Sequence, residues 1–312
     1  MEVVLFLVSL GVTLYAASIF ASRLDHLGHR FGLPEALLGL LTAAGADAPE
    51  LASAITAIAT GDKNVGLGVV VGSNVFNLAA MLGLSALLVG SVQLRRRTLA
   101  LEGGVAVGVA IVIGLLGFGV VPGWGALALS LVVLVPYVVV VARRPRGDVL
   151  GEPHRARPLH GRALRNALLL IPPSIAAIVL GSIGMVHAAL RLGHRAGMPS
   201  VLVGVLLLAV LTSLPNAYTG VRLGRARRGA ALVSETMNSN TINLLGGVAL
   251  PAVVVGFGTR FSGLVAADFL WLVLGTSVTV VLLGHPHGLR RAGGVLLVAS
   301  WLGFAVVQGV FG

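Results

Sequence analysis

Long apolar segments alternate with short polar gaps along the whole chain. Residues 3–21, 105–121 and 263–284 are examples of segments long enough to cross the hydrocarbon core of a bilayer as helices. Segment by segment, the pattern predicts ten helices, at residues 2–22, 33–61, 64–90, 98–120, 123–142, 166–190, 199–222, 230–255, 261–283 and 292–311. The chain is therefore predicted to be an all-α polytopic membrane protein whose main partner is the lipid bilayer.

Composition supports this prediction. The chain is 56% hydrophobic and 11% charged, with a mean hydropathy of +0.98. A soluble domain needs a more charged exterior, so a soluble fold is excluded. The chain has no cysteine, which excludes disulfides, thiolate metal sites and cysteine nucleophiles.

The basic residues are distributed unevenly between the two sides of the predicted bundle. The net charge is +11, but the charges lie in the gaps between apolar segments, which argues against nucleic-acid binding. Alternate gaps place 18 Lys and Arg residues on one side and only Lys63, Arg191, Arg195 and Arg260 on the other. The positive-inside rule makes the richer side cytoplasmic. We therefore expect a multi-pass protein of the cell (inner or plasma) membrane with both termini extracytoplasmic.

One long polar gap divides the chain. Residues 143–165 are rich in Arg, Pro and Gly, which is typical of a linker at the cytoplasmic surface. This predicts two five-helix halves, at residues 1–142 and 166–312. The first segment begins with Glu2 and lacks a basic leader, so no cleaved signal peptide is expected.

The two halves share three sequence blocks at offsets of 165 or 166 positions. LGHRFGLP (27–34) matches LGHRAGMP (192–199), GADAPELASA (45–54) matches LTSLPNAYTG (211–220), and GSNVFNLAAMLG (72–83) matches NSNTINLLGGVA (238–249). The LGHR segments are expected in loops, before prolines that suit the first turn of a helix. Because each copy contains an odd number of helices, the second copy enters from the opposite face. The sequence thus predicts two inverted repeats, an architecture of secondary transporters with a site where the repeats meet.

Two carboxylates lie in the middle of the second apolar segment. Asp47 and Glu50 would cost on the order of 3 kcal/mol each there unless they are paired, hydrated or bound to a cation. Pro49 and Pro215 cannot donate a backbone hydrogen bond, so helices two and seven are expected to break at mid-membrane and expose carbonyl oxygens. With the side-chain oxygens of this region, these carbonyls resemble the shell that a hard cation such as Ca²⁺ prefers. The side chains concerned are Asp47, Glu50, Thr212, Ser213 and Asn216.

The next helix of each half supplies an opposite wall. Ser73 and Asn77 are four residues apart and share a helix face, as do Glu235, Ser239 and Asn243. Serine and asparagine also hold membrane helices together without binding any ion. The symmetric set, taken with three carboxylates, favours a cation pathway.

These motifs resemble those of the cation/calcium exchanger superfamily, whose repeats pair a G-T-S-x-P-E block with a G-S-N-x-x-[N/D] block. The resemblance covers residues 33–90 and 199–255 and implies ten helices with both termini outside. It implies that Glu50, Asn77 and Asn243 bind ions, with Ser73, Ser239, Thr212 and Ser213 as flanking ligands.

The chain departs from the family pattern at several of these positions. Asn216 replaces the second glutamate, and Asp47 stands where serine is usual. Ala46, Leu211 and Asn238 are further departures. The four central positions therefore carry one formal negative charge, to which Asp47 and Glu235 could each add one. A divalent ion at mid-membrane needs about two negative charges nearby, and Glu50 with Asp47 can supply them.

The sequence therefore indicates a secondary antiporter that exchanges a divalent cation, Ca²⁺ above all, for Na⁺ by alternating access. Two neighbouring carboxylates also favour proton binding, so a proton-coupled antiporter with Glu50 or Asp47 as carrier stays open, as does an exchanger of Mg²⁺, Mn²⁺ or K⁺. A cation channel is a weaker alternative, and an intramembrane hydrolase weaker still, because most histidines are expected in loops. No enzyme activity, cofactor or nucleic-acid partner is expected, and the oligomeric state is open between monomer and homodimer.

Three further residues are expected to be structural. Glu102 and Asp268 lie near predicted helix starts, where a carboxylate is favourable or interfacial. Trp124 is expected to be an interface or packing aromatic.

Overall fold

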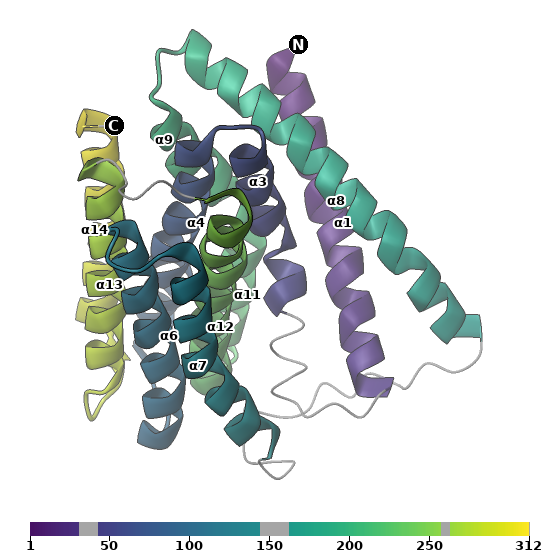
Figure 1. Cartoon of the computed structure of the whole chain (residues 1–312). Helices are drawn as coiled ribbons and strands as arrows, with labels where there is room; N and C mark the ends of the chain where they lie inside the picture. Colours follow the sequence, from purple (N-terminus) through teal and green to yellow (C-terminus); the bar gives the residue numbers. More distant parts are fainter. Residues whose placement is uncertain (31–42, 144–161, 257–262, 312) are drawn as a thin grey trace.

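The computed structural model describes residues 1–30, 43–143, 162–256 and 263–311 (Figure 1). Within these ranges the chain is almost entirely helical, as its apolar segments predict. The helices are α1 Glu2–Arg30, α3 Ala48–Ala59, α4 Lys63–Asn77, η1 Leu78–Gly83, α5 Leu84–Val89, α6 Arg96–Gly117, α7 Gly123–Ala142, α8 Arg162–Arg195, α9 Ser200–Leu202, η2 Val203–Leu208, α10 Ala209–Thr212, α11 Leu214–Arg225, α12 Gly229–Leu244, η3 Leu245–Ala249, η4 Ala252–Gly256, α13 Gly263–Leu283 and α14 Arg291–Phe311. The elements labelled η are π-helical, and two short strands are β1 Ser91–Val92 and β2 Leu289–Arg290.

Eight helices of the described chain are long and apolar enough to cross a membrane. The helices on either side of Ser213 meet at a bend of 48°, and together they are long and apolar enough to form a ninth span. The shorter α3 has 12 residues, and residues 31–42 of the second predicted helix lie outside the described ranges. Most of the predicted linker, 144–161, lies outside them too. The chain is thus a multi-pass helical membrane protein.

The two LGHR segments do not lie in loops, contrary to the prediction. Helix α1 continues to Arg30 and α8 continues to Arg195, so each segment forms the end of a helix. His26, His29 and His194 are therefore helical rather than in loops. Neither four-residue segment contains a proline, and a lone glycine is tolerated within a helix.

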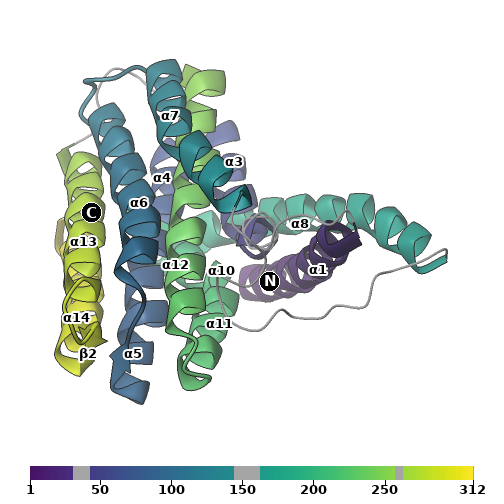
Figure 2. The same cartoon turned by 90° about the horizontal axis from the view of Figure 1, so that it is seen from below.

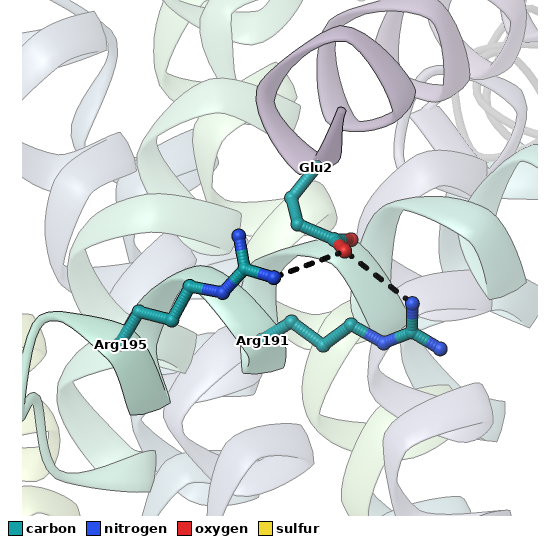
Figure 3. Close-up of polar contacts among 3 residues, drawn as sticks. All are labelled: Glu2, Arg191 and Arg195. Carbon is teal, nitrogen blue, oxygen red and sulfur yellow. Dashed lines mark hydrogen bonds and ion pairs between the residues drawn. The ribbon is translucent and has the colours of Figure 1, made fainter.

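Helices α1 and α8 lie side by side along one flank of the molecule (Figures 1 and 2). Small residues allow this approach, because a side chain at Gly181 or Gly184 of α8 would collide with Ser9 or Thr13 of α1. At one end of the two helices, the buried carboxylate of Glu2 forms ion pairs with Arg191 and Arg195 (Figure 3). Glu2 Oε1 lies 3.4 Å from Arg191 Nη1 and 3.7 Å from Arg195 Nη2. The start of α1 and the end of α8 are therefore held at the same end of the bundle.

The other long helices form a bundle beside this pair, with α4 and α12 well inside it and α13 and α14 at the far edge (Figures 1 and 2). Strands β1 and β2 pair antiparallel, which joins the gap before α6 to the gap before α14. Both gaps were predicted to lie on the side of the membrane that carries most of the arginines. Their pairing places them at the same end of the bundle, which agrees with that prediction.

The two halves also pack closely where α4 crosses α9 and η2. A Cβ atom at Gly68 would lie 2.9 Å from the carbonyl oxygen of Val201, and one at Gly72 would lie 2.9 Å from the Cα atom of Val205. Gly204 in turn lies against the backbone of Val65. Small residues at such crossings let membrane helices pack backbone to backbone. This contact sets the distance between the candidate side chains of the two halves.

Candidate functional site

The two expected helix breaks are confirmed, and each lies two residues before a proline. Residues 43–46 are helical, Asp47 interrupts them, and α3 begins at Ala48 with Pro49 as its second residue. In the second half, α10 ends at Thr212, Ser213 interrupts, and Pro215 is the second residue of α11. Asp47 and Ser213 have nearly the same backbone angles, with φ of −82° and −86° and ψ of −2° and 2°. Proline suits the first turn of each new helix, because its missing N–H group would have no partner there.

The breaks bring the carboxylates of the first half against donors from the second. Asp47 is 0% exposed and Glu50 is 1% exposed. Ser213 donates to Glu50 Oε1 at 2.9 Å, and Asn216 donates to Asp47 Oδ1 at 2.8 Å and to Glu50 Oε1 at 3.2 Å. Glu50 also lies in the first turn of α3, where the helix dipole stabilises a negative charge.

Side chains of helices α4 and α12 lie on the other side of this group. Ser239 donates to Asp47 Oδ1 at 2.7 Å, and Asn77 donates to Ser239 Oγ at 3.2 Å. Asn77 also contacts Asn240 Oδ1 at 3.2 Å, and Asn243 donates to Asn74 Oδ1 at 3.2 Å. Side chains from α3, α4, α11 and α12 therefore form one continuous buried network.

Four oxygen atoms of this network accept no hydrogen bond from the described residues. They are Asp47 Oδ2, Glu50 Oε2, Asn77 Oδ1 and Asn243 Oδ1, and all are buried. A buried oxygen without a donor costs about 1–3 kcal/mol, and more if it is charged, so such atoms call for a partner. Two carboxylate and two amide oxygens are the atoms that a hard cation such as Ca²⁺ binds. These four oxygens are therefore candidate ligands for such a cation.

The remaining predicted residues lie at the edge of this group. The Ser73 hydroxyl donates to the carbonyl of Val70, and the Thr212 hydroxyl donates to that of Leu208. Both oxygens are buried and keep lone pairs for a ligand. Glu235 is half-buried one turn before Ser239, within electrostatic range of Asp47. The described residues hold no group of three or more His, Cys, Asp or Glu side chains that could hold a metal ion.

Sequence reasoning did not select Asn74 and Asn240 as site residues, although the repeat alignment pairs them. Each donates its side-chain amide to the backbone carbonyl of the other, and both distances are 3.1 Å. This reciprocal contact joins α4 to α12 at equivalent positions. A π-helical segment follows each of the two asparagines Asn77 and Asn243 almost at once, at η1 and η3. Such widened turns are frequent at functional sites.

Glu102 and Asp268, the two carboxylates expected to be structural near helix starts, are both buried. Glu102 accepts hydrogen bonds from Tyr137 and Ser234, and Asp268 accepts one from Gln308. Helix position alone does not reveal these partners. Trp124, by contrast, is largely exposed, as an aromatic at the interface would be.

The sequence matches one family model and several known proteins. The family model described as "Sodium/calcium exchanger protein" matches residues 1–144 and 166–310. The chain is 25% identical over 318 residues to the putative antiporter CaxA of Alkalimonas amylolytica, covering 96% of this chain and 95% of that protein. It is 26% identical over 260 residues to the inner membrane protein YrbG of Escherichia coli (strain K12), covering 80% of this chain and 79% of the relative.

A solved structure shares the whole fold. The sodium-calcium exchanger NCX_Mj superposes with a TM-score of 0.66 at 18% identity, covering 100% of this chain and 99% of that chain. At this identity the likeness concerns the arrangement of the helices.

Proposed function

The chain belongs to the family of sodium/calcium exchanger proteins, and we propose that it is a secondary antiporter that exchanges Ca²⁺ for Na⁺ across a cell membrane. The observation that carries this proposal is the set of four buried oxygens without a donor, on Asp47, Glu50, Asn77 and Asn243. Both helix breaks and both following helices converge on these atoms. A transported cation would bind between them and leave again, so the protein acts as a transporter and not as an enzyme.

The charges of the site favour a divalent ion. Asp47 and Glu50 together supply two negative charges, which match one Ca²⁺ in a place where water is excluded. The ligands are oxygens of mixed type in an irregular shell, which Ca²⁺ accepts and the smaller Mg²⁺ accepts less readily. Ser73, Thr212, Ser213, Asn216, Glu235 and Ser239 would complete the shell or its surroundings.

The proposed architecture is ten spans in two inverted halves, at residues 1–142 and 166–312, joined by a linker at 143–165. Reciprocal contacts support it. Asn74 and Asn240 exchange equivalent hydrogen bonds across 166 positions. Asp47 accepts a hydrogen bond from Asn216, and Glu50 accepts one from Ser213. The repeat pairs Asp47 with Ser213 and Glu50 with Asn216, so the second contact is the repeat-related copy of the first. Each contact has a partner related by the same offset, as an internal two-fold axis requires, and alternating access would open the site to one face at a time.

The proposed orientation places both termini outside the cell. The gaps before α6 and before α14 are joined by β1 and β2 at one end, and they carry Arg95, Arg96, Arg97, Arg290 and Arg291. Arg191 and Arg195 lie beside Glu2 at the start of α1. They belong to the side of the membrane that is predicted to carry few basic residues. The positive-inside rule then assigns the first end to the cytoplasm.

The test is gradient-driven uptake of radioactive Ca²⁺ into proteoliposomes. An outward Na⁺ gradient and an outward H⁺ gradient are imposed in separate experiments, on the wild type and on Glu50→Gln. Uptake that needs the Na⁺ gradient and falls about 100-fold or more in Glu50→Gln is the expected result, because one of two buried charges is lost.

A matched control is Asp268→Asn, which removes a buried carboxylate outside the site and should leave uptake within about two-fold of wild type. Uptake driven only by the H⁺ gradient would replace Na⁺ with H⁺ as the coupling ion. Ca²⁺ uptake that persists in Glu50→Gln, or that is absent from folded wild-type protein under both gradients, would overturn the proposal.

A further inference from the structure

The turn between α3 and α4 and the turn between α11 and α12 have the same backbone hydrogen bonds, 166 positions apart. Gly61 donates its backbone N–H to the carbonyl of Ile58 at 3.1 Å, and Arg227 donates to that of Gly224 at 2.9 Å. Gly61 has a φ of 99° and Arg227 has a φ of 56°. Glycine is the usual residue at such a helix end, because a side chain is unfavourable in the left-handed region. Within the described chain, Arg227 is the one non-glycine residue with a positive φ, so an arginine stands here at a conformational cost.

The residue two positions further on also differs between the two turns. Lys63 of the first turn donates its side-chain ammonium to the carbonyl of Gly256 at 3.0 Å. At the offset of 166 positions, Lys63 corresponds to Gly229, and Gly256 corresponds to Gly90, which also has a positive φ. Gly229 has no side chain that could reach Gly90, and a Cβ atom there would collide with the carbonyl oxygen of Gln93. The side-chain bridge of the first turn is therefore absent from the second.

A cavity of about 220 Å³ lies at this second turn. Because a water molecule takes up about 30 Å³, the cavity has room for several waters or for a small polar ligand. Its walls come from both halves of the chain, since the segment before α6 lines one side and the turn between α11 and α12 lines the other. The lining residues include Ser91, Val92, Gln93, Gly224, Arg227 and Gly229.

Three connections between helices meet around the cavity, and their acidic and basic residues are all of one sign. Strand β1 pairs with β2, and Gln93 Nε2 lies 3.4 Å from the carbonyl oxygen of His287. The connections comprise residues 89–97, 222–229 and 284–291, which contain nine arginines and no Asp or Glu. A concave surface of one charge concentrates ions of the opposite charge, so the cavity attracts anions.

Two of these guanidinium groups lie at the cavity. Arg227 lines it, and Arg291 Nε lies 4.0 Å from the position that a Cβ atom of Gly90 would take. Arg227 and Arg291 are both exposed, so a ligand can reach them from water or from the membrane surface. A guanidinium group donates two parallel hydrogen bonds to phosphate oxygens, which adds geometric selectivity to its charge. The chemistry of the cavity therefore favours a phosphate group.

We propose that the cavity binds a phosphate group, held by Arg227 and Arg291. Arg96 and Arg291 begin α6 and α14, so the cavity lies where these spans leave the bilayer and where the phosphates of lipids are found. The phosphate belongs to an anionic phospholipid headgroup or to a free anion. In either case it joins the segment before α6 to α11 and α12, the helices that carry Asn216 and Ser239. The inference goes beyond the proposed exchange of cations and does not depend on it.

The test measures the unfolding temperature of the purified protein, because a ligand that binds only the folded state raises it. One arm adds inorganic phosphate to the protein in detergent, with chloride at the same ionic strength as the reference. The other arm compares lipid nanodiscs of phosphatidylcholine alone with nanodiscs that also contain phosphatidylglycerol. A saturable rise with inorganic phosphate identifies a free anion, and a rise with phosphatidylglycerol alone identifies a lipid headgroup. No rise in either arm overturns the proposal.

Arg227→Gly separates binding from folding. It introduces the residue found at the repeat-related position, Gly61, so without phosphate or phosphatidylglycerol it should unfold at the same temperature as wild type or a higher one. The ligand concentration for half of the stabilisation should rise at least about ten-fold, because a two-pronged guanidinium contact is lost.

Arg225→Gln is the matched control. It removes an exposed arginine of the same connection that does not line the cavity, and its half-saturating concentration should stay within about two-fold of wild type. An equal loss in Arg225→Gln and Arg227→Gly would show a general attraction of anions to this end of the molecule and would overturn the cavity site.

Two further variants keep the test decisive. Arg227→Asn takes the place of Arg227→Gly if that variant does not fold, because asparagine also tolerates the left-handed region. Glu50→Gln should be stabilised by the ligand as wild type is, so a failure of cation exchange and a failure of phosphate binding are distinguishable. Stabilisation that disappears in Glu50→Gln would contradict a separate phosphate site.

Discussion

At the scale of residues, the two fully buried carboxylates at the helix break, Asp47 and Glu50, both come from the first half of the chain. The repeat pairs Glu50 with Asn216 and Asp47 with Ser213. Asn216 donates to Asp47 at 2.8 Å, so the position that lacks a carboxylate in one half directly contacts the extra carboxylate of the other. The first half therefore supplies two negative charges, and the second half supplies an amide that binds one of them.

This placement predicts the outcome of a charge exchange. Asp47→Ser removes one of two buried charges and should raise the Ca²⁺ concentration for half-maximal uptake by about 100-fold. Adding Asn216→Glu restores two charges, and uptake should return to within about ten-fold of wild type. A double variant as impaired as the single one would show that Asp47 does more than supply charge.

The chemistry of each residue also decides whether its role could be predicted from the sequence. Asp47, Glu50 and the prolines stand out because carboxylates and helix breaks are costly in an apolar segment. The roles of Asn74, Asn240 and Glu102 do not stand out, because their hydrogen-bond partners lie more than 30 positions away. The sequence identified the groups that a membrane cannot tolerate alone, and only the fold identified their partners.

At the scale of elements, the crossing of α4 with α9 and η2 depends on glycine. A Cβ at Gly72 would lie 2.9 Å from Val205 Cα and 3.0 Å from Ala209 Cβ. Gly72→Ala should therefore lower the free energy of unfolding by about 1–3 kcal/mol, since the backbones must separate. Gly104→Ala on α6 has no atom within 4 Å of its new Cβ and is expected to be neutral or stabilising by up to about 1 kcal/mol. Thermal unfolding in detergent compares the two, and equal losses would contradict the close crossing.

Element types were predictable, but the details of their ends and turns were not. Hydrophobic runs located the spans, and the two prolines located the breaks. The π-helical segments η1 and η3 have no strong sequence signal, because they arise from how α4 and α12 pack after Asn77 and Asn243. The extension of α1 and α8 through the LGHR segments was missed because glycine and histidine neither begin nor end a helix decisively.

At the scale of the whole molecule, the proposed orientation in the membrane can be tested by labelling introduced cysteines, with no background from native thiols. The chain has no cysteine, so any introduced cysteine is the only thiol. Gly197→Cys, beyond the end of α8, should react with an impermeant thiol reagent added outside intact cells. Gln93→Cys, at the end closed by β1 and β2, should react only after the cells are opened. The reverse pattern would show that the termini face the cytoplasm.

The central claim is that side chains from both halves form one cation site, and equilibrium Ca²⁺ binding tests it most directly. Isothermal titration of the purified protein in detergent would compare the wild type with Glu50→Gln and Asn243→Ala, which remove one oxygen without a donor from each half. The account predicts one Ca²⁺ per chain, bound at least about ten-fold more weakly by Asn243→Ala and about 100-fold more weakly by Glu50→Gln. Binding that survives both changes, or that depends on one half alone, would contradict it.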